Sequence, residues 1–194
     1  MVFIFVPHDF GVLRLFASVD CDGRSDAITG VQEPLVGLSG LRPTDPTQAH
    51  VTMAFLGEGE HDLDALSAGL ETAVEATDIG PFELTLEGVG AFPSEEYITV
   101  VWLGVGRGSA ALSELHRRIE AETTALGYDA SDHDFTPHVT LARMDDASSK
   151  DKVQRFLRET APEIGPLRIE ELRLKESVLT DEGPEYRTVE RVEL

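Results

Sequence analysis

Two short segments of the chain carry the same pair of side chains at the same spacing. AHVTMAFLG begins at residue 49 and PHVTLARM begins at residue 137. Each places a histidine two positions before a threonine, which gives the pairs His50 with Thr52 and His138 with Thr140. One His-x-Thr is a weak motif in a chain with six histidines. Two copies in the same apolar frame indicate a repeated functional element.

Two histidines opposed across a cleft are suited to general acid–base catalysis, because imidazole has a pKa near 6.5. One ring accepts a proton from water while the other donates a proton to a leaving group, and each role typically gives about 10²- to 10⁴-fold in rate. Threonine hydroxyls can donate to phosphoryl oxygens, and Arg143 would add a fork-shaped cation. Such a set needs no metal, and no His-x₃-His or cysteine pair stands at zinc-ligand spacing. The residues therefore predict phosphoryl chemistry without a cofactor.

Strand geometry explains the spacing of two, because side chains at i and i+2 of a strand point to the same face. His50 and Thr52 should share one face, and Val51, Met53 and Phe55 the other. The second motif predicts the same division, with Val139 and Leu141 on the apolar side. Strict alternation puts Arg143 opposite His138, so Arg143 can join the site only where the strand ends or bulges.

The hydrophobic periodicity predicts the elements that carry these motifs. Strands are expected over 12–20, 78–92, 97–105 and 163–177, and helices over 61–76, 109–127 and 149–161. The segment 25–38 reads as a poor helix interrupted by Pro34. The Gly-rich segment 104–109 reads as a turn between a strand and a helix, since it lacks the Gly-Lys-Ser/Thr ending of a phosphate loop.

The order of these elements repeats along the chain. Each half reads strand, helix, motif strand, helix, strand, and Ile-Gly-Pro recurs at 79–81 and 164–166. We expect two similar α+β lobes, roughly 13–94 and 95–194, in a single bilobal domain over 13–194. Without a Ser- or Gly-rich linker, the lobes should pack closely or exchange strands. The first 12 residues read as an N-terminal extension.

The charge of the chain restricts its partners. Its 36 acidic and 16 basic residues give a net charge of −20, which argues against a broad phosphate-binding surface. We interpret this as halophilic acidification for a high-salt cytoplasm, where a Debye length of about 3 Å screens the repulsion. No uninterrupted apolar stretch reaches the length of a membrane span, and Cys21 is the single cysteine. We expect a cytoplasmic monomer.

Beyond the two motifs, the segments LRLFASVD, VVWLGV and LRLKESVLTDEGPEY complete a resemblance. The chain resembles the 2H phosphoesterase superfamily and, within it, the RNA 2′,3′-cyclic phosphodiesterases, also called 2′-5′ RNA ligases. The resemblance implies a bilobal α+β fold with antiparallel sheets lining a central cleft and helices outside. It also implies hydrolysis of RNA or nucleoside 2′,3′-cyclic phosphates to 2′-phosphates, with RNA termini or such nucleotides as partners.

The same resemblance gives roles to the motif residues. It implies that His138 activates water, that His50 protonates the departing oxygen, and that Thr52, Thr140 and Arg143 hold the phosphate. The near-symmetric motifs leave the opposite division of acid and base open. A 2′-5′ RNA ligase, a 2′-5′ phosphodiesterase and a non-catalytic module that binds RNA ends remain alternatives.

Other residues that could do chemistry receive simpler interpretations. Phe135 and Phe92 are candidates for stacking on a nucleobase, whereas Trp102 is expected in the core. Arg42 reads as an ordinary loop arginine. The remaining histidines are expected to be solvated: His8, His61, His116 and His133.

Overall fold

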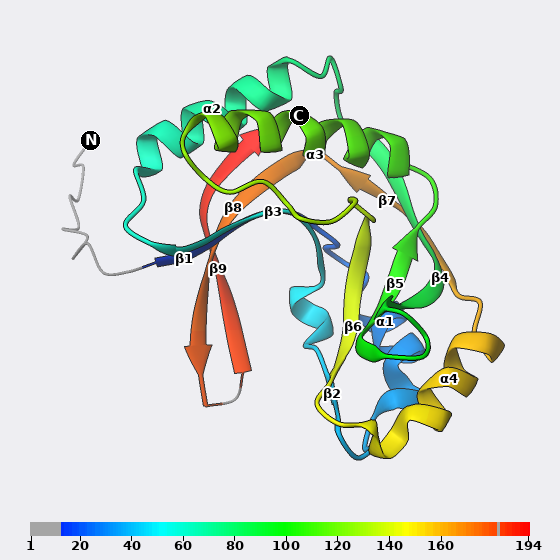
Figure 1. The fold of residues 1–194 in the computed structure, drawn as a ribbon. Coiled ribbons are helices and arrows are strands. Elements are labelled where there is room, and N and C mark those ends of the chain that lie inside the picture. The colour runs from blue at the N-terminus through cyan, green and yellow to red at the C-terminus, as the bar shows by residue number, and fades with distance from the viewer. Residues whose placement is uncertain (1–12, 182) are drawn as a thin grey trace, which may run out of the picture.

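The computed structural model describes residues 13–181 and 183–194, so the predicted N-terminal extension lies outside the described residues. Nine strands form one curved antiparallel sheet in the order β7-β4-β5-β6-β3-β1-β8-β9, with β2 pairing on β6 (Figure 1). The strands are β1 (Leu13–Asp20), β2 (Leu41–Pro43), β3 (His50–Gly59), β4 (Phe82–Pro93), β5 (Ile98–Val105), β6 (His138–Met144), β7 (Glu163–Ile169), β8 (Glu171–Thr180) and β9 (Gly183–Glu193). The architecture is the predicted α+β class.

Four α-helices accompany the sheet, and short 3₁₀ turns connect them to the strands. The α-helices are α1 (Ser25–Gln32), α2 (Leu63–Glu75), α3 (Ser109–Ala125) and α4 (Lys150–Glu159), and the 3₁₀ turns are η1 (Glu33–Leu35), η2 (Pro46–Gln48) and η3 (Ala147–Ser149). The poor helix predicted before Pro34 is the short α1, which passes into η1 at that proline. Within the described residues, no helix combines the length and the apolar character needed to cross a membrane.

The sheet has two halves that meet at a narrow junction. β3 and β6 join through the single pair Val51 and Val139. On one side lie β1, β8 and β9, where α2 and α3 pack against each other and contact β9 and β3, respectively. On the other side lie β5, β4 and β7, where α1 contacts β6 and α4 contacts β4. The two His-x-Thr strands are therefore the inner strands of the two halves.

The two halves exchange segments along the chain. β4 comes from the first half of the sequence but pairs with β5 and β7, whereas the C-terminal β8 and β9 extend the sheet beside β1. Likewise α3 follows β5 in the sequence but contacts β3 across the junction. Neither half of the sequence supplies all the strands of one half of the sheet, so each half of the sheet depends on both halves of the chain.

Amphipathic patterns produce the core that holds this sheet. Helix α2 buries Leu66, Leu70 and Val74 at helical spacing, as the periodicity predicts. Its start is capped by Asp62, whose Oδ1 accepts a hydrogen bond from the Ala65 N–H at 3.0 Å. Strand residues that alternate with the His-x-Thr pairs fill the sheet side of the core.

The C-terminal region differs from its predicted organisation. The single strand expected over 163–177 is two strands, because the chain leaves β7 beside β4, passes Glu170, and enters β8 beside β1. Apolar and polar residues continue to alternate through this break. The sequence pattern therefore does not reveal that the chain crosses from one half of the sheet to the other. Strand β9, which was not predicted, then completes a hairpin with β8.

Candidate active site

The two His-x-Thr pairs lie on neighbouring strands and on one face. Because Val51 pairs with Val139 in antiparallel register, His50 comes opposite Thr140 and Thr52 comes opposite His138. All four side chains are half-buried, whereas the two valines between them are buried. Diagonal neighbours across an antiparallel pair typically have Cβ atoms about 7–8 Å apart. The four side chains therefore form a compact square of two imidazoles and two hydroxyls.

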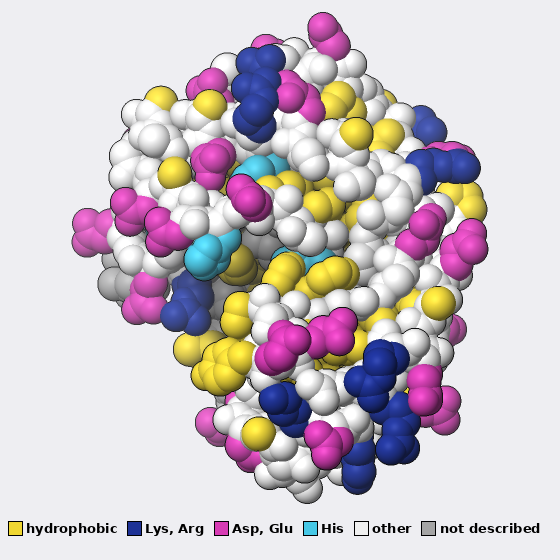
Figure 2. Space-filling view, turned by 45° about the vertical axis from the view of Figure 1, so that its right-hand side comes forward, with side chains coloured by type: hydrophobic (Ala, Val, Ile, Leu, Met, Phe, Trp, Pro, Cys, Tyr) yellow, Lys and Arg dark blue, Asp and Glu magenta, His cyan; other side chains and the backbone are white. Residues whose placement is uncertain are grey.

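One face of the molecule carries a hollow. Figure 2 shows a hollow in one face of the molecule, bordered by histidine and hydrophobic side chains. Acidic side chains occupy much of the surrounding surface in this view. Histidine, hydrophobic and charged side chains thus meet at this hollow.

Both motif histidines are fixed by equivalent hydrogen bonds. His50 Nδ1 lies 2.8 Å from the carbonyl oxygen of Gln48, and His138 Nδ1 lies 2.7 Å from that of Thr136. A carbonyl oxygen only accepts, so Nδ1 donates its proton in both rings. In the neutral form this leaves the lone pair on Nε2. Each ring can therefore exchange a proton through Nε2 while Nδ1 holds its orientation.

Gln48 also links His50 to the C-terminal hairpin. Its Oε1 accepts a hydrogen bond from the Tyr186 N–H at 2.7 Å, and its Nε2 donates to the Pro184 carbonyl at 3.4 Å. The residue whose carbonyl orients the imidazole is thus tied by its side chain to β9. Through Gln48, the position of His50 depends on the last strand of the chain.

Burial lowers the pKa of both imidazoles below the ordinary value of 6.5. For His50, the carbonyl bond and Asp20 act in the opposite direction, whereas the charges of Lys175 and His138 lower the pKa further. For His138, the carbonyl bond raises the pKa and the Arg143 guanidinium lowers it. The influence of His138 on His50 agrees with the closeness that the strand register requires.

Aromatic rings hold each imidazole from two sides. The rings that pack against His50 are Phe16 and Tyr186, both with centroids 5.1 Å away. Those beside His138 are Phe92 at 4.9 Å and Trp102 at 6.2 Å. The two halves of the sheet thus supply similar aromatic settings, which restrict rotation of the imidazoles and exclude water from their flanks.

Arg143 reaches the site through a bulge in β6. Thr140 and Ala142 pair with consecutive residues of β5, so Leu141 is an extra residue in the strand. Leu141 and Ala142 are both buried, and alternation resumes with an exposed Arg143 on the face of Thr140. The guanidinium is close enough to lower the pKa of His138. The strand therefore bulges where the sequence analysis required a bulge for Arg143 to lie on the motif face.

A family model described as the 2′-5′ RNA ligase superfamily matches residues 30–178, which is most of the chain. The chain belongs to this superfamily. It is 32% identical over 182 residues to the RNA 2′,3′-cyclic phosphodiesterase of Methanothermobacter thermautotrophicus, a match that covers 92% of this chain and 97% of the relative. It is 33% identical to the protein of that name from Archaeoglobus fulgidus, over 90% and 97% of the two chains.

Solved structures show the same fold as this superfamily member. TT0787 of Thermus thermophilus superposes with a TM-score of 0.73 at 25% identity, over 94% of this chain and 98% of that one. Apo LigT of E. coli also superposes with a TM-score of 0.73, at 24% identity over 95% and 98%. The antiparallel sheet and its helices are thus those of known 2H phosphoesterases.

A second bulge corrects the predicted position of Phe55 in the superfamily member. Thr52 and Ala54 pair with consecutive residues of β1, which leaves Met53 as the extra residue of β3. Phe55 is consequently 72% exposed and lies opposite Phe16, with ring centroids 6.3 Å apart. The prediction that Phe55 belongs to the buried apolar row is wrong, because the bulge turns the residue to the other face.

The two proposed stacking residues have different surroundings. Phe92 lies at the cleft with its ring edge-to-face against His138. Phe135 stacks on His116 with centroids 4.1 Å apart and an interplanar angle of 11°, so one face of its ring is already covered. Trp102 was expected in the core but is half-buried beside His138. Phe92 is therefore the better placed of the two phenylalanines.

Two of the other histidines are structural. His61 is half-buried, with Nδ1 2.9 Å from the Tyr128 hydroxyl and Nε2 3.0 Å from a carbonyl of β1. His116 Nδ1 lies 2.7 Å from a carbonyl of β3. The prediction that both are solvated is wrong, because their partners come from distant segments. His133 is exposed as predicted, and His8 lies outside the described residues.

Arg42 is placed beside Arg143 but is already paired. The two arginines lie opposite each other across β2 and β6. Arg42 donates two hydrogen bonds to the Asp145 carboxylate, at 2.5 and 2.6 Å. Of the two, Arg143 therefore offers its guanidinium to the cleft without a carboxylate partner among the described residues. Arg42 was predicted to be an ordinary loop arginine. It lies on β2 and forms a surface ion pair with Asp145.

Sequence reasoning missed a group of residues that surround His50. They share the cleft face of β1, β8 and β9: Phe16, Ser18, Asp20, Lys175 and Tyr186. A signal existed in β1, where an aromatic and two polar residues alternate with a purely apolar row. No comparable signal marked the lysine, which is 5% exposed, since lysine alternating in a strand usually indicates a solvated face.

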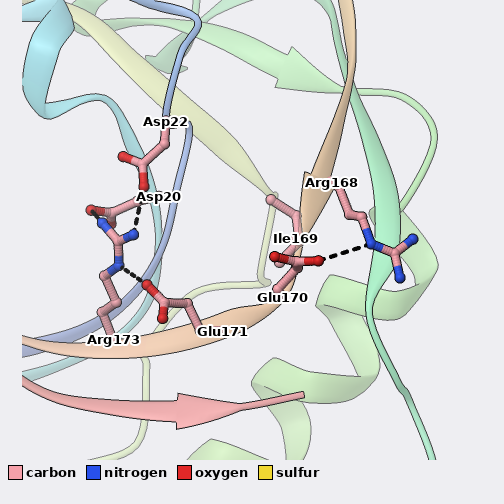
Figure 3. Close-up of a pocket in the computed structure, with 7 residues that line it drawn as sticks. All are labelled: Asp20, Asp22, Arg168, Ile169, Glu170, Glu171 and Arg173. Atoms are coloured by element: carbon pink, nitrogen blue, oxygen red, sulfur yellow. Dashed lines mark hydrogen bonds and ion pairs between the residues drawn. The ribbon is translucent and has the colours of Figure 1, made fainter.

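Behind Asp20, this superfamily member has a separate charged pocket. It is about 310 Å³ in volume and lies between the ends of β1, β7 and β8, lined by Asp20, Asp22, Arg168, Ile169, Glu170, Glu171 and Arg173 (Figure 3). Arg173 contacts Asp20, Asp22 and Glu171, and Arg168 contacts Glu170. Nowhere in residues 13–181 and 183–194 are three histidine, cysteine or carboxylate side chains arranged to hold a metal.

Proposed function

We propose that this chain is a cyclic phosphodiesterase that opens the 2′,3′-cyclic phosphate of RNA ends or nucleosides to leave a 2′-phosphate. The observation that carries the proposal is the square of His50, Thr52, His138 and Thr140 on one face, with both Nδ1 atoms bound to carbonyls. The names of the two archaeal relatives, at 32% and 33% identity over nearly the whole chain, support the same activity.

The reaction needs one base, one acid and a set of phosphate donors. His138 Nε2 takes a proton from water, and the water oxygen forms a bond to phosphorus as the bond to O3′ breaks. His50, protonated on Nε2, gives its proton to O3′, which leaves as the 3′-hydroxyl. Thr52, Thr140 and Arg143 donate hydrogen bonds to the non-bridging oxygens, whose charge grows in the transition state. The 2′-ester bond remains intact.

The surroundings of the two histidines support this division of roles. On β1, Asp20 pairs with His50, whereas on β5 the corresponding residue opposite His138 is Gly104. The Asp20 carboxylate favours the imidazolium of His50 while the Lys175 ammonium opposes it, so the first ring is suited both to hold a proton and to release it. Arg143 acts on His138 and favours its neutral form, which a base requires.

The acidic character of the molecule favours short substrates. With a net charge of −20, the surface would repel a long phosphate backbone, and we take the terminus of an RNA or a free cyclic nucleotide as the substrate. Exposed Phe55 and half-buried Phe92 flank the square and offer ring surfaces to a nucleobase. We further propose that residues 13–194 act as one bilobal domain, as a cytoplasmic monomer.

The proposal is tested with adenosine 2′,3′-cyclic phosphate in the presence of EDTA and high salt. Phosphorus NMR should show conversion of the cyclic phosphate signal to a 2′-phosphate, without a 3′-phosphate. A 3′-phosphate product, or loss of turnover in EDTA, would contradict the scheme. Binding of adenosine 2′-phosphate without turnover would instead favour a module that binds RNA ends. Joining of RNA ends would reveal 2′-5′ ligation, which the superfamily description includes.

A further inference from the structure

A lysine is buried on the cleft face next to His50. The side chain of Lys175 is 5% exposed, and its Nζ donates to Asp20 Oδ2 at 2.7 Å. The same Nζ lies 5.7 Å from the centre of the Tyr186 ring. A lysine is seldom buried unless it is paired, because its charge loses hydration. This lysine therefore belongs to a built arrangement and not to a solvated strand face.

The carboxylate that pairs with Lys175 has donors on both oxygens. Asp20 Oδ2 also accepts from Arg173 Nη1 at 2.6 Å, and Oδ1 accepts from Ser18 Oγ at 2.9 Å. Burial acts to raise the pKa of Asp20, but the hydrogen bonds and charges of these partners lower it overall. Asp20 is therefore ionised at neutral pH, and it stays paired with Arg173 if the lysine is removed.

This ion pair is connected to His50 in two ways. Asp20 pairs with His50 across β1 and β3, which brings the carboxylate beside the imidazole. Tyr186 packs edge-on against the same ring at 5.1 Å, while Lys175 lies over the tyrosine. The two charges act on His50 with opposite signs: the carboxylate favours the imidazolium, and the ammonium opposes it with the larger effect of the two.

His138 has no equivalent of this pair within the described residues. The β5 residues opposite its motif are Gly104 and Trp102, which carry no charge. Arg143 is the charged side chain that acts on it. The two halves of the sheet are thus alike in their motifs and aromatic rings but differ in the charges behind the histidines.

We propose that Asp20 and Lys175 are positioning residues that tune the imidazole of His50, and not that of His138, for its role as the proton donor of the site. The carboxylate stabilises the imidazolium of His50, while the lysine holds the carboxylate and the Tyr186 ring against it. The inference rests on the proposed function and deepens it, since it gives a structural origin to the division of acid and base.

The test removes the positive and the negative charge in separate variants. The titration of His50 is followed by NMR in the free protein. The groups that face His50 are Asp20 on β1, His138 on β6, Lys175 on β8 and Tyr186 on β9. K175M removes the cation and should raise the pKa of His50, whereas D20N removes the anion and should lower it. The double variant removes both and should titrate between the two single variants. His138 should move much less in all three proteins.

Activity provides the second measurement, with K152M as the control. Lys152 is exposed on α4, so K152M changes the net charge equally without touching the site. D20N and K175M should each lower kcat by about tenfold or more, a part of the effect of an acid catalyst, and the alkaline limb of the kcat profile should move with the His50 titration. K152M should leave both unchanged.

The outcomes separate this inference from the proposed function. Shifts of His50 in the same direction in both variants, or no shift in folded variants, would overturn the positioning role. Equal shifts of His138 would also overturn it. A wild-type protein that does not turn over any cyclic phosphate would overturn the proposed function, whereas the titrations would still report on the pair.

Discussion

Each motif histidine in this molecule is defined by the groups that bind and flank its ring. The Nδ1 of His50 and that of His138 both donate to the carbonyl two residues earlier, which fixes the tautomer. Packing against two aromatic rings then removes water and lowers both pKa values. The charges beside the two rings differ, since Asp20 and Lys175 act on His50 whereas Arg143 acts on His138. Residue identity alone does not reveal this difference.

These shifts predict the pH dependence of the reaction. In the proposed reaction, the base His138 must be neutral, so kcat/KM rises as the pH rises through its pKa. The acid His50 must be protonated, so kcat/KM falls as the pH rises through its own pKa. Both pKa values lie below 6.5 in the free protein. We expect a bell-shaped pH profile of kcat/KM with its maximum on the acidic side of neutrality. The alkaline limb of the kcat profile should lie at higher pH, because bound phosphate stabilises the imidazolium. A kcat/KM bell centred above pH 7 would argue against these environments.

The two neighbouring arginines allow a matched comparison. In the role proposed for Arg143, R143A removes charge-assisted hydrogen bonds to phosphate, worth about 1.5–3 kcal/mol, and should lower kcat/KM by about 10- to 100-fold. R143K should recover part of the loss, because an ammonium supplies charge without the fork. R42A should stay near wild type, since Arg42 is held by Asp145. Steady-state kinetics on a cyclic nucleotide measure all three, and equal losses in R42A and R143A would refute the assignment.

At the level of elements, one-residue bulges decide which side chains reach the cleft. The extra Leu141 in β6 turns Arg143 toward the motif face, and the extra Met53 in β3 does the same for Phe55. Bulges of this kind re-aim side chains next to functional sites. The strands therefore combine a regular His-x-Thr face with irregular positions that complete it.

The limits of prediction from the sequence follow from the same features. Alternation and helical spacing identified both motif strands and the helices α2, α3 and α4, because a single face of each is buried. The family resemblance supplied the fold. Phe55 was assigned to the wrong face, and the break at Glu170 was not predicted. Both depend on partners elsewhere in the chain, because these partners determine register shifts and crossings between the sheet halves. Buried Lys175 was missed because its stabilising carboxylate, on the neighbouring strand β1, is far away in the sequence.

A glycine in β4 provides a test of how an element positions the site. A Cβ on Gly90 would lie 2.2 Å from Cζ2 of Trp102, whose ring packs near His138. G90A should displace the indole, lower kcat by about tenfold, and destabilise the protein by about 1–3 kcal/mol as an overpacked core does. G59A is the control, because a Cβ at Gly59 meets open space. Urea unfolding and kinetics would contradict this role if G90A resembled G59A.

On the scale of the whole molecule, exchange of segments ties the site to the complete chain. His50 is supported by β9, the last strand, through Gln48 and Tyr186, whereas β4 supplies Phe92 to the other half. The 36 acidic residues against 16 basic ones surround this assembly with repulsive charge. Repulsion weakens the folded state at low salt, and screening relieves it.

Salt should therefore stabilise this protein. Raising KCl from about 0.1 M to about 2 M shortens the Debye length to a few ångströms, so the midpoint of thermal unfolding should rise by several degrees. Turnover of a cyclic nucleotide should persist at the higher salt, because the phosphate is held by groups inside the cleft. Circular dichroism melts measure the first effect. An unchanged or lower midpoint would contradict the halophilic interpretation of the charge.

The central claim is that both motifs act on one phosphate, and paired substitution of the histidines tests it most directly. H50A and H138A should each reduce kcat for adenosine 2′,3′-cyclic phosphate by about 10²- to 10⁴-fold. If the two rings act as a unit, the kcat of H50A/H138A should be little lower than that of the less active single variant. Wild-type kcat in either folded single variant would contradict the claim.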